Sequence, residues 1–169
     1  MFFSLRRRLW LLGSAGLLLS GLVHALDAPK GKVVLSIVGN IQFKNAGDQA
    51  NFDMDMLTAL PQHSFTTSNP WYKEAKKFTG PLLRDVLAAA GAEGTTVKAI
   101  ALNNFKVEIP VADFKQFPVI LARLMDDKPM LIREKGPLFI IYPFDTQAEL
   151  HSARYYGRSA WQLRTLDIR

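Results

Sequence analysis

The segment of residues 130–145 constrains the fold most, because it contains a short run that suits a buried strand. Residues 138–142 are continuously apolar, rich in β-branched and aromatic side chains, and bracketed by Gly136-Pro137 and Pro143. This composition between turn residues is typical of a strand buried on both faces. We therefore expect a core strand here. The polar and aromatic residues at its ends either support a ligand site or are ordinary solvated strand ends.

The first 25 residues have the pattern of a secretory signal peptide. Three consecutive arginines precede an almost wholly apolar stretch at residues 9–23, and residues 23–25 have the small-x-small pattern of a cleavage site. The stretch is shorter than the roughly 20 residues that a membrane-spanning helix needs. We expect cleavage after Ala25, export to the periplasm, and a single domain over residues 26–169. An uncleaved N-terminal anchor is the alternative.

The positive charge of the chain depends largely on this leader. Without residues 1–25, three of the 21 basic residues and none of the 15 acidic ones are lost, which leaves a net charge of +3. The remainder has no basic stripe, and Lys73, Lys76 and Lys77 fit a solvated helix face. We therefore expect no nucleic acid partner.

Helix and strand signals follow one another closely along the rest of the chain. Asn51 is expected to cap a helix over residues 52–60, and the segment from Thr79 to Pro81 to begin another that Gly91 ends. Many short strands with two or three short helices predict an α+β domain. The expected strands are residues 33–41, 97–102, 106–109, 119–124, 130–133, 138–142 and 161–168.

Familiar catalytic patterns are missing from the sequence. There is no cysteine, no Gly-x-Ser-x-Gly elbow and no phosphate-binding glycine-rich loop. Beyond the leader only His63 and His151 remain, and they lack ligand spacing. Asp53 and Asp55 fit a helix start better than a metal site. We expect recognition rather than catalysis.

Aromatic and polar residues near the ends of the expected elements are the candidate binding residues. Rings can stack on the faces of a planar heterocycle, and amides or charged groups can pair with its edge. Taken alone, each aromatic fits the core better than a binding site, and it is their grouping with polar residues that favours a site. The candidates are Trp71, Asn104, Phe105, Arg133, Lys135, Tyr142, Phe144 and Asp145.

Three segments resemble a known family. Residues 78–87, residues 101–110 and residues 133–143 are similar, in order and spacing, to the small exported relatives of the sulfite oxidase molybdopterin-binding domain. The resemblance implies a compact sulfite oxidase-like domain of mixed β-sheets with short flanking helices and a pterin cleft. Catalytic members hold molybdenum through a cysteine, which this chain lacks, so the resemblance is greatest to cysteine-free periplasmic pterin-binding regulators of the PruR type.

This resemblance implies a function without metal chemistry. The expected ligand is a reduced pterin, no molybdenum is expected, and the expected partner is the periplasmic region of a membrane-bound diguanylate cyclase/phosphodiesterase. The chain would then act in cyclic-di-GMP signalling and biofilm control and would not be an enzyme. Two alternatives remain: a molybdopterin-dependent oxidoreductase or its accessory subunit, and a pure interaction module whose cleft is filled by side chains.

Overall fold

The computed structural model describes residues 26–169 and confirms an α+β fold. The expected signal peptide and its cleavage site lie in residues 1–25, outside the described residues. Within residues 26–169, no helix has both the length and the apolar character needed to span a membrane. The buried apolar side chains form one continuous core.

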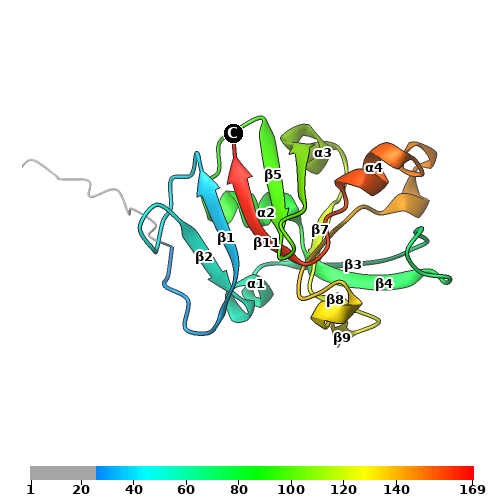
Figure 1. Cartoon of the computed structure of the whole chain (residues 1–169), viewed down its shortest axis with the longest axis horizontal. Coiled ribbons are helices and arrows are strands. Elements are labelled where there is room, and N and C mark those ends of the chain that lie inside the picture. The colour runs from blue at the N-terminus through cyan, green and yellow to red at the C-terminus, as the bar shows by residue number, and fades with distance from the viewer. Residues whose placement is uncertain (1–25) are drawn as a thin grey trace, which may run out of the picture.

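The largest sheet has five strands in the order β2-β1-β11-β5-β6 (Figure 1). β1 and β11 pair in parallel, and the other neighbours are antiparallel. The strands are β1 (Val33–Gly39), β2 (Ala50–Asp53), β5 (Thr96–Ala101), β6 (Lys106–Pro110) and β11 (Leu163–Ile168).

Two smaller sheets continue the core. One is a two-stranded ladder of β7 (Ile120–Ala122) and β10 (Phe139–Ile141), and its six residues are all buried. The other has the order β3-β4-β8-β9, and β3 and β4 project from the body of the molecule (Figure 1). Its strands are β3 (Gln62–Thr67), β4 (Lys76–Pro81), β8 (Leu124–Met125) and β9 (Lys128–Pro129).

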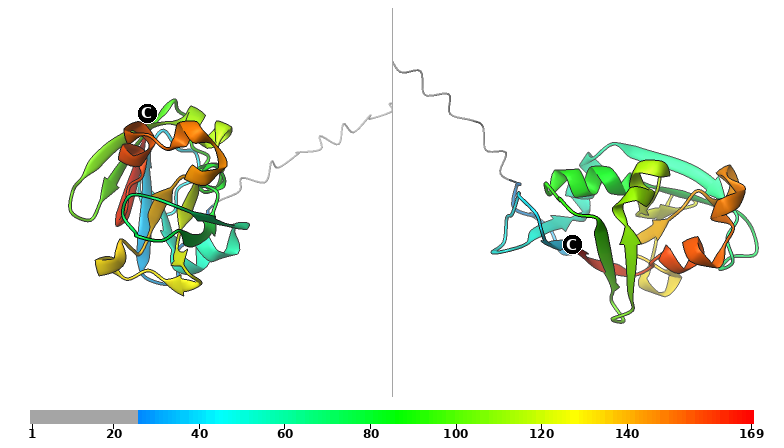
Figure 2. Two further views of the ribbon diagram at one scale, coloured as in Figure 1. Left: turned by 90° about the vertical axis from the view of Figure 1, so that its right-hand side faces the viewer. Right: turned by 90° about the horizontal axis from the view of Figure 1, so that it is seen from above.

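Short helices complete the fold. The view from above in Figure 2 shows α2 behind the large sheet, while the β5–β6 hairpin extends from the other side. The helices are α1 (Met54–Ala59), α2 (Leu83–Ala89), α3 (Val111–Gln116) and α4 (Ala153–Arg158), with 3-10 turns η1 (Ile132–Glu134), η2 (Phe144–Thr146) and η3 (Ala148–Leu150).

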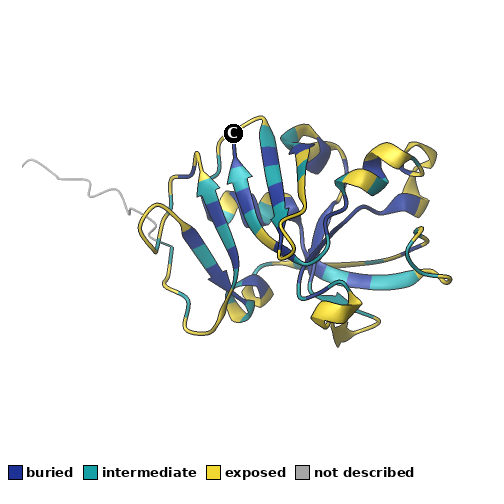
Figure 3. Ribbon diagram, viewed as in Figure 1, coloured by how far each residue is buried: buried dark blue, intermediate teal, exposed yellow. Residues whose placement is uncertain are grey.

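The large sheet buries one face and leaves the other partly open. Along β1, Leu35 and Ile37 are buried, whereas the alternating residues Val34, Ser36 and Val38 are partly exposed (Figure 3). Because successive side chains of a strand point to opposite faces, the second set lies on the outer face. This open face is where a ligand or partner can approach the sheet.

Several expected element boundaries were wrong. The segment from Thr79 to Pro81 is the end of β4, and the following helix begins at Leu83 without a side-chain cap. Gly80 is needed there because a β-carbon would lie 2.0 Å from the backbone oxygen of Leu121. Gly91, with φ +58°, ends the helix region as expected.

Lys76 and Lys77 lie in β4 rather than on a helix face. Their ammonium groups lie 2.8 Å from carboxylate oxygens of Asp126 and Asp127, respectively. Those two aspartates form the turn of a short hairpin between β8 and β9. The strand expected over residues 130–133 was wrong, because the chain leaves the hairpin at Pro129 and residues 132–134 form the 3-10 turn η1. β7 pairs with β10 instead, because both are apolar throughout and are buried together.

Asp53, not Asn51, caps α1. Its Oδ1 accepts a hydrogen bond from the Met56 amide at 2.9 Å, and its Oδ2 accepts from the Lys30 and Gly31 amides at 2.8 Å each. These hydrogen bonds, that from Met56 foremost, lower the pKa of the Asp53 carboxyl. The carboxylate therefore fixes the chain before β1 to the start of α1.

We expect Asp53→Asn to reduce stability at neutral pH and to have less effect in acid. A carboxyl whose pKa is lower in the folded state stabilises fully above its unfolded pKa, and this contribution is lost as pH falls through the folded pKa. Melting temperatures measured from about pH 7 to about pH 2 should differ by a few degrees at the upper end and converge at the lower. Asp55→Asn, at an exposed site in the same helix turn, is the control. A constant difference across the range would contradict the assignment.

Candidate functional site

A cleft on the open side of the large sheet is the candidate site, and we call it the η1 cleft. It has a volume of about 430 Å³, within the usual range for small-molecule sites. Its walls come from the start of β1, the β5–β6 turn, η1 and the start of β11. It is lined by Lys32, Val33, Val34, Ser36, Leu102, Ile132, Pro137, Leu163 and Arg164.

Gln162 holds two walls of the η1 cleft together. Its backbone oxygen accepts a hydrogen bond from the Leu102 amide at 2.8 Å, and its side-chain Nε2 donates to the Ile132 oxygen at 2.8 Å. Its own amide donates to the Lys135 oxygen at 3.0 Å. Gln162 has φ +51°, a conformation that aims its groups at both the β5–β6 turn and η1. The hydrogen bonds of Gln162 therefore hold the β5–β6 turn and η1 in place on either side of the cleft.

The walls of the η1 cleft carry exposed apolar side chains. Val33, Leu102 and Ile132 are 39, 40 and 58% exposed, and all three line it. Phe105, 49% exposed, follows Leu102 in the same turn, and Leu131, 47% exposed, precedes Ile132. Grouped exposed apolar side chains beside a concave surface favour binding of an apolar or aromatic ligand.

The charges that line the η1 cleft are both positive. Arg164 and Lys32 line it, and no acidic side chain does. Within residues 26–169, neither cation has a carboxylate oxygen within 4.0 Å. Arg164 Nη2 donates a long hydrogen bond of 3.4 Å to Oδ1 of Asn104. The site thus combines apolar walls with donors that retain hydrogen-bonding capacity.

Three of the residues expected from the sequence lie near the η1 cleft. Asn104, with φ +64°, forms the β5–β6 turn and contacts Arg164, while Phe105 is exposed beside it. Arg133 lies in η1 next to Ile132, and its side chain is 79% exposed. Its Nε is 3.9 Å from Oε1 of Glu134, a weak surface pair.

Two of the expected aromatics, Tyr142 and Phe144, belong to the core instead. Both are fully buried, so neither offers a ring face to a ligand. The sequence-based assignment of these two as stacking groups was therefore wrong. They follow β10, and α4 packs against them: the ring centroid of Tyr155 lies 5.4 Å from that of Tyr142, and the ring centroid of Tyr156 lies 4.8 Å from that of Phe144.

Trp71 is half-buried at the centre of an aromatic cluster. Its ring centroid lies 5.4 Å from Phe139, 5.6 Å from Trp161 and 6.1 Å from Tyr156, each at a steep angle. Edge-to-face contacts of this kind stabilise packing. Lys135 Nζ lies 4.3 Å from the ring centroid of Trp161, a cation–π contact that places its charge beside this cluster.

Asp145 already has partners. Its Oδ2 accepts a hydrogen bond from the Ser68 amide at 2.7 Å, and its Oδ1 lies 3.1 Å from His151 Nε2. The carboxylate joins η2 to the end of β3, and each of its two oxygens has one partner within the fold. The expected residues thus separate into a group at the η1 cleft and a group around Trp71, and Lys135 connects the two through its backbone and side chain.

Sequence reasoning missed Arg164, Lys32 and Gln162. Arg164 lies in the expected final strand, whose alternation predicts an outward side chain, so an unpaired cation there could have been recognised. Lys32 immediately precedes the first strand and gives no comparable signal. The sequence around Gln162 does not predict a left-handed backbone conformation, because glycine and asparagine are the residues that usually adopt it.

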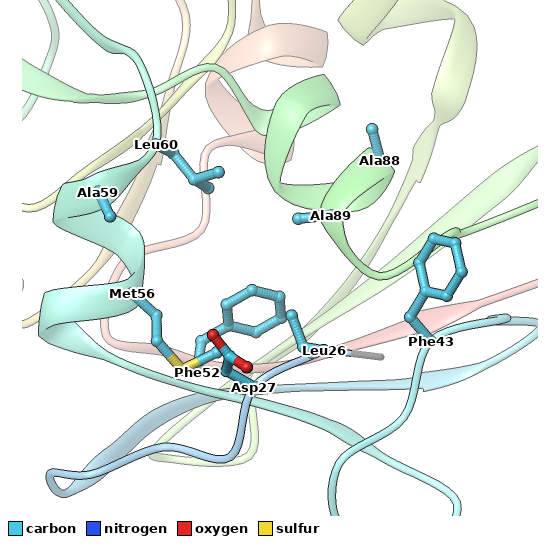
Figure 4. Close-up of a pocket in the computed structure, with 9 residues that line it drawn as sticks. All are labelled: Leu26, Asp27, Phe43, Phe52, Met56, Ala59, Leu60, Ala88 and Ala89. Carbon is cyan, nitrogen blue, oxygen red and sulfur yellow. The ribbon is translucent and has the colours of Figure 1, made fainter. Parts of the chain in front are cut away.

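A second pocket lies between the N-terminal segment, α1 and α2, with a volume of about 380 Å³ (Figure 4). Its walls are apolar side chains such as Phe43, Phe52 and Met56, and its single charged lining residue is Asp27. No lining side chain can donate a hydrogen bond once Asp27 is ionised. The two pockets therefore differ in polarity: the N-terminal pocket offers an acceptor, and the η1 cleft offers the donors Lys32 and Arg164.

Comparison with known proteins adds no assignment. Neither the protein-family models nor the curated proteins include a match to this chain. Among residues 26–169, no group of three or more His, Asp or Glu side chains is arranged to hold a metal ion, and the sequence supplies no thiolate. The donor set in the described part of the chain therefore does not fit a molybdenum centre of the cysteine-ligated kind.

Proposed function

We propose that this protein is a periplasmic sensor that binds a reduced pterin in the η1 cleft. One observation carries the proposal: a concavity of about 430 Å³ combines apolar walls with an arginine that has no carboxylate partner among residues 26–169. A pterin is a planar heterocycle with polar edges, so apolar side chains suit its faces and hydrogen-bonding groups suit its edge. Asn104 and Arg164 are the proposed edge contacts, and Phe105 is the proposed exposed ring beside them.

The proposed output is regulation of a membrane-bound diguanylate cyclase/phosphodiesterase, and through it of biofilm formation. The support is the leader pattern at residues 1–25 together with the resemblance of three segments to periplasmic pterin-binding regulators. The partner must distinguish the bound protein from the empty one, since equal affinity for both would transmit nothing. The exposed Ile132 and Phe105 beside the cleft are available for such a contact.

Calorimetric titration of the metal-free protein with tetrahydropterin and dihydropterin under nitrogen tests the binding step. We expect a dissociation constant of about 1 μM or lower. Trp161, which contacts Lys135 next to η1, should report binding through a change in fluorescence. Metal analysis of protein from its native host accompanies the titration. Absence of pterin binding would contradict the proposal, and stoichiometric molybdenum would favour the oxidoreductase alternative.

A further inference from the structure

We infer that the η1 cleft selects pterins whose side chain carries an anion, a carboxylate or a phosphate, over neutral pterins. This inference rests on the proposed function and adds the class of ligand. Its basis is the charge of the lining: Arg164 and Lys32 are present, and acidic side chains are not. Among residues 26–169, Arg164 has a long hydrogen bond to Asn104 and neither cation has a carboxylate oxygen within 4.0 Å, so an anion on the ligand would be their charged partner.

Arg164 is the stronger of the two contacts. Its hydrogen bond to Asn104 is 3.4 Å long and occupies one of five donors, so most of the guanidinium remains available. A guanidinium binds carboxylate or phosphate through two parallel hydrogen bonds, and such charge-assisted bonds are about twice as strong as neutral ones. Lys32 contributes a second positive charge from the chain just before β1.

The position of the cations relative to the apolar walls explains why the anion is placed on the ligand's side chain rather than on its ring. Val33, Leu102 and Ile132 give the surface on which a ring rests. Arg164 follows Leu163 in β11 and lies next to the exposed β5–β6 turn, as its contact with Asn104 shows. A substituent that leaves the ring toward this turn meets the guanidinium. The N-terminal pocket has the opposite character, because its charged lining residue is Asp27.

The test compares dihydropterins that share the ring and carry either a neutral or an anionic group at C6. Isothermal titration would measure the affinity of the metal-free protein for 6-hydroxymethyl-dihydropterin, for its phosphate ester, and for the dihydropterin 6-carboxylate. We expect at least one of the two anionic ligands to bind about tenfold tighter or more than the neutral alcohol. The preference should weaken as ionic strength rises, because both cations are solvent-exposed. Comparing the phosphate with the carboxylate identifies the preferred anion.

Variants that remove a positive charge test which side chains cause the preference for anionic pterins. Arg164→Gln and Lys32→Gln should each reduce it and the double variant should abolish it. Arg164→Gln should also weaken binding of the neutral alcohol, because Arg164 is a proposed edge contact of the ring, but by a smaller factor than it weakens the anionic ligands. Arg164→Lys should retain part of the preference. Arg154→Gln, which removes an exposed cation of α4 that lines neither pocket, is the matched control and should keep it in full. Circular dichroism and melting temperature check that each variant is folded.

The outcomes separate the two claims. Equal affinity for neutral and anionic pterins, or a preference that persists in the double variant, would overturn this inference and leave the proposed function in place. Failure of every pterin to bind would overturn the proposed function, and the inference with it.

Discussion

Replacing Asp113 with alanine is expected to lower the free energy of unfolding by about 3–5 kcal/mol. Asp113 is 6% exposed, and its Oδ2 accepts hydrogen bonds from the Tyr142 hydroxyl at 2.7 Å and from Arg158 Nη1 at 2.8 Å. The substitution leaves a buried hydroxyl and a mostly buried guanidinium without their partner. Removing one member of a buried pair is costly because the other stays desolvated and unpaired.

Tyr142→Phe provides the comparison for this prediction. Burial and the adjacent Asp113 carboxylate raise the pKa of the Tyr142 hydroxyl, so it remains a donor at any ordinary pH. Losing that donor leaves the ion pair with Arg158 intact, so the expected loss is only about 1 kcal/mol. Urea unfolding of both variants measures the two costs. An Asp113→Ala variant no less stable than Tyr142→Phe would show that the pair does not hold α3, β10 and α4 together.

Replacing Ser36 with tryptophan is expected to weaken pterin binding at least about a hundredfold while the protein remains folded. Ser36 lines the η1 cleft from the open face of the large sheet. A large ring at this position occupies the space of the ligand. Because the side chain projects away from the core, the added volume does not have to be accommodated by buried neighbours.

Val38→Trp is the matched control for this variant. Val38 lies two residues further along β1 on the same face, is partly exposed, and does not line the η1 cleft. The Val38→Trp variant should bind pterin with the affinity of the unchanged protein. Titration calorimetry on both variants decides the matter. Unchanged affinity in Ser36→Trp would place the ligand elsewhere, and equal loss in both would indicate a general disturbance of the sheet.

The parts of the fold that sequence predicted well are those governed by local patterns. The apolar run at residues 138–142 is buried, the strands expected at residues 97–102 and 106–109 are β5 and β6, and the strand expected at residues 161–168 is the half-buried β11. Each depends on side-chain periodicity or on turn residues, which neighbouring residues decide.

The features that depend on pairing between distant segments, such as strand order and element boundaries, were predicted less well from the sequence. Residues 138–142 form only a two-stranded ladder, whereas β11 lies at the centre of the large sheet. Gly80-Pro81 has the appearance of a helix start, yet pairing with β3 extends β4 through it. Such choices are set by tertiary contacts, which override local preference.

The difference between local patterns and tertiary contacts also explains which site residues were predicted from the sequence. Asn104 and Phe105 were found because a polar turn with an aromatic residue is visible in the sequence. Tyr142 and Phe144 were misassigned because their burial depends on packing against Tyr155 and Tyr156 of α4, a tertiary contact that the local sequence does not predict. Arg164 and Gln162 become part of the site only through contacts with the β5–β6 turn and η1.

The most direct test of the account is where a reduced pterin binds. Backbone amide chemical shifts of the isotopically labelled, metal-free protein would be followed during titration with dihydropterin. The account predicts the largest changes at Leu102, Ile132 and Arg164, which line the η1 cleft. Changes concentrated at Phe43 and Met56 of the N-terminal pocket, or no changes at saturating ligand, would contradict it.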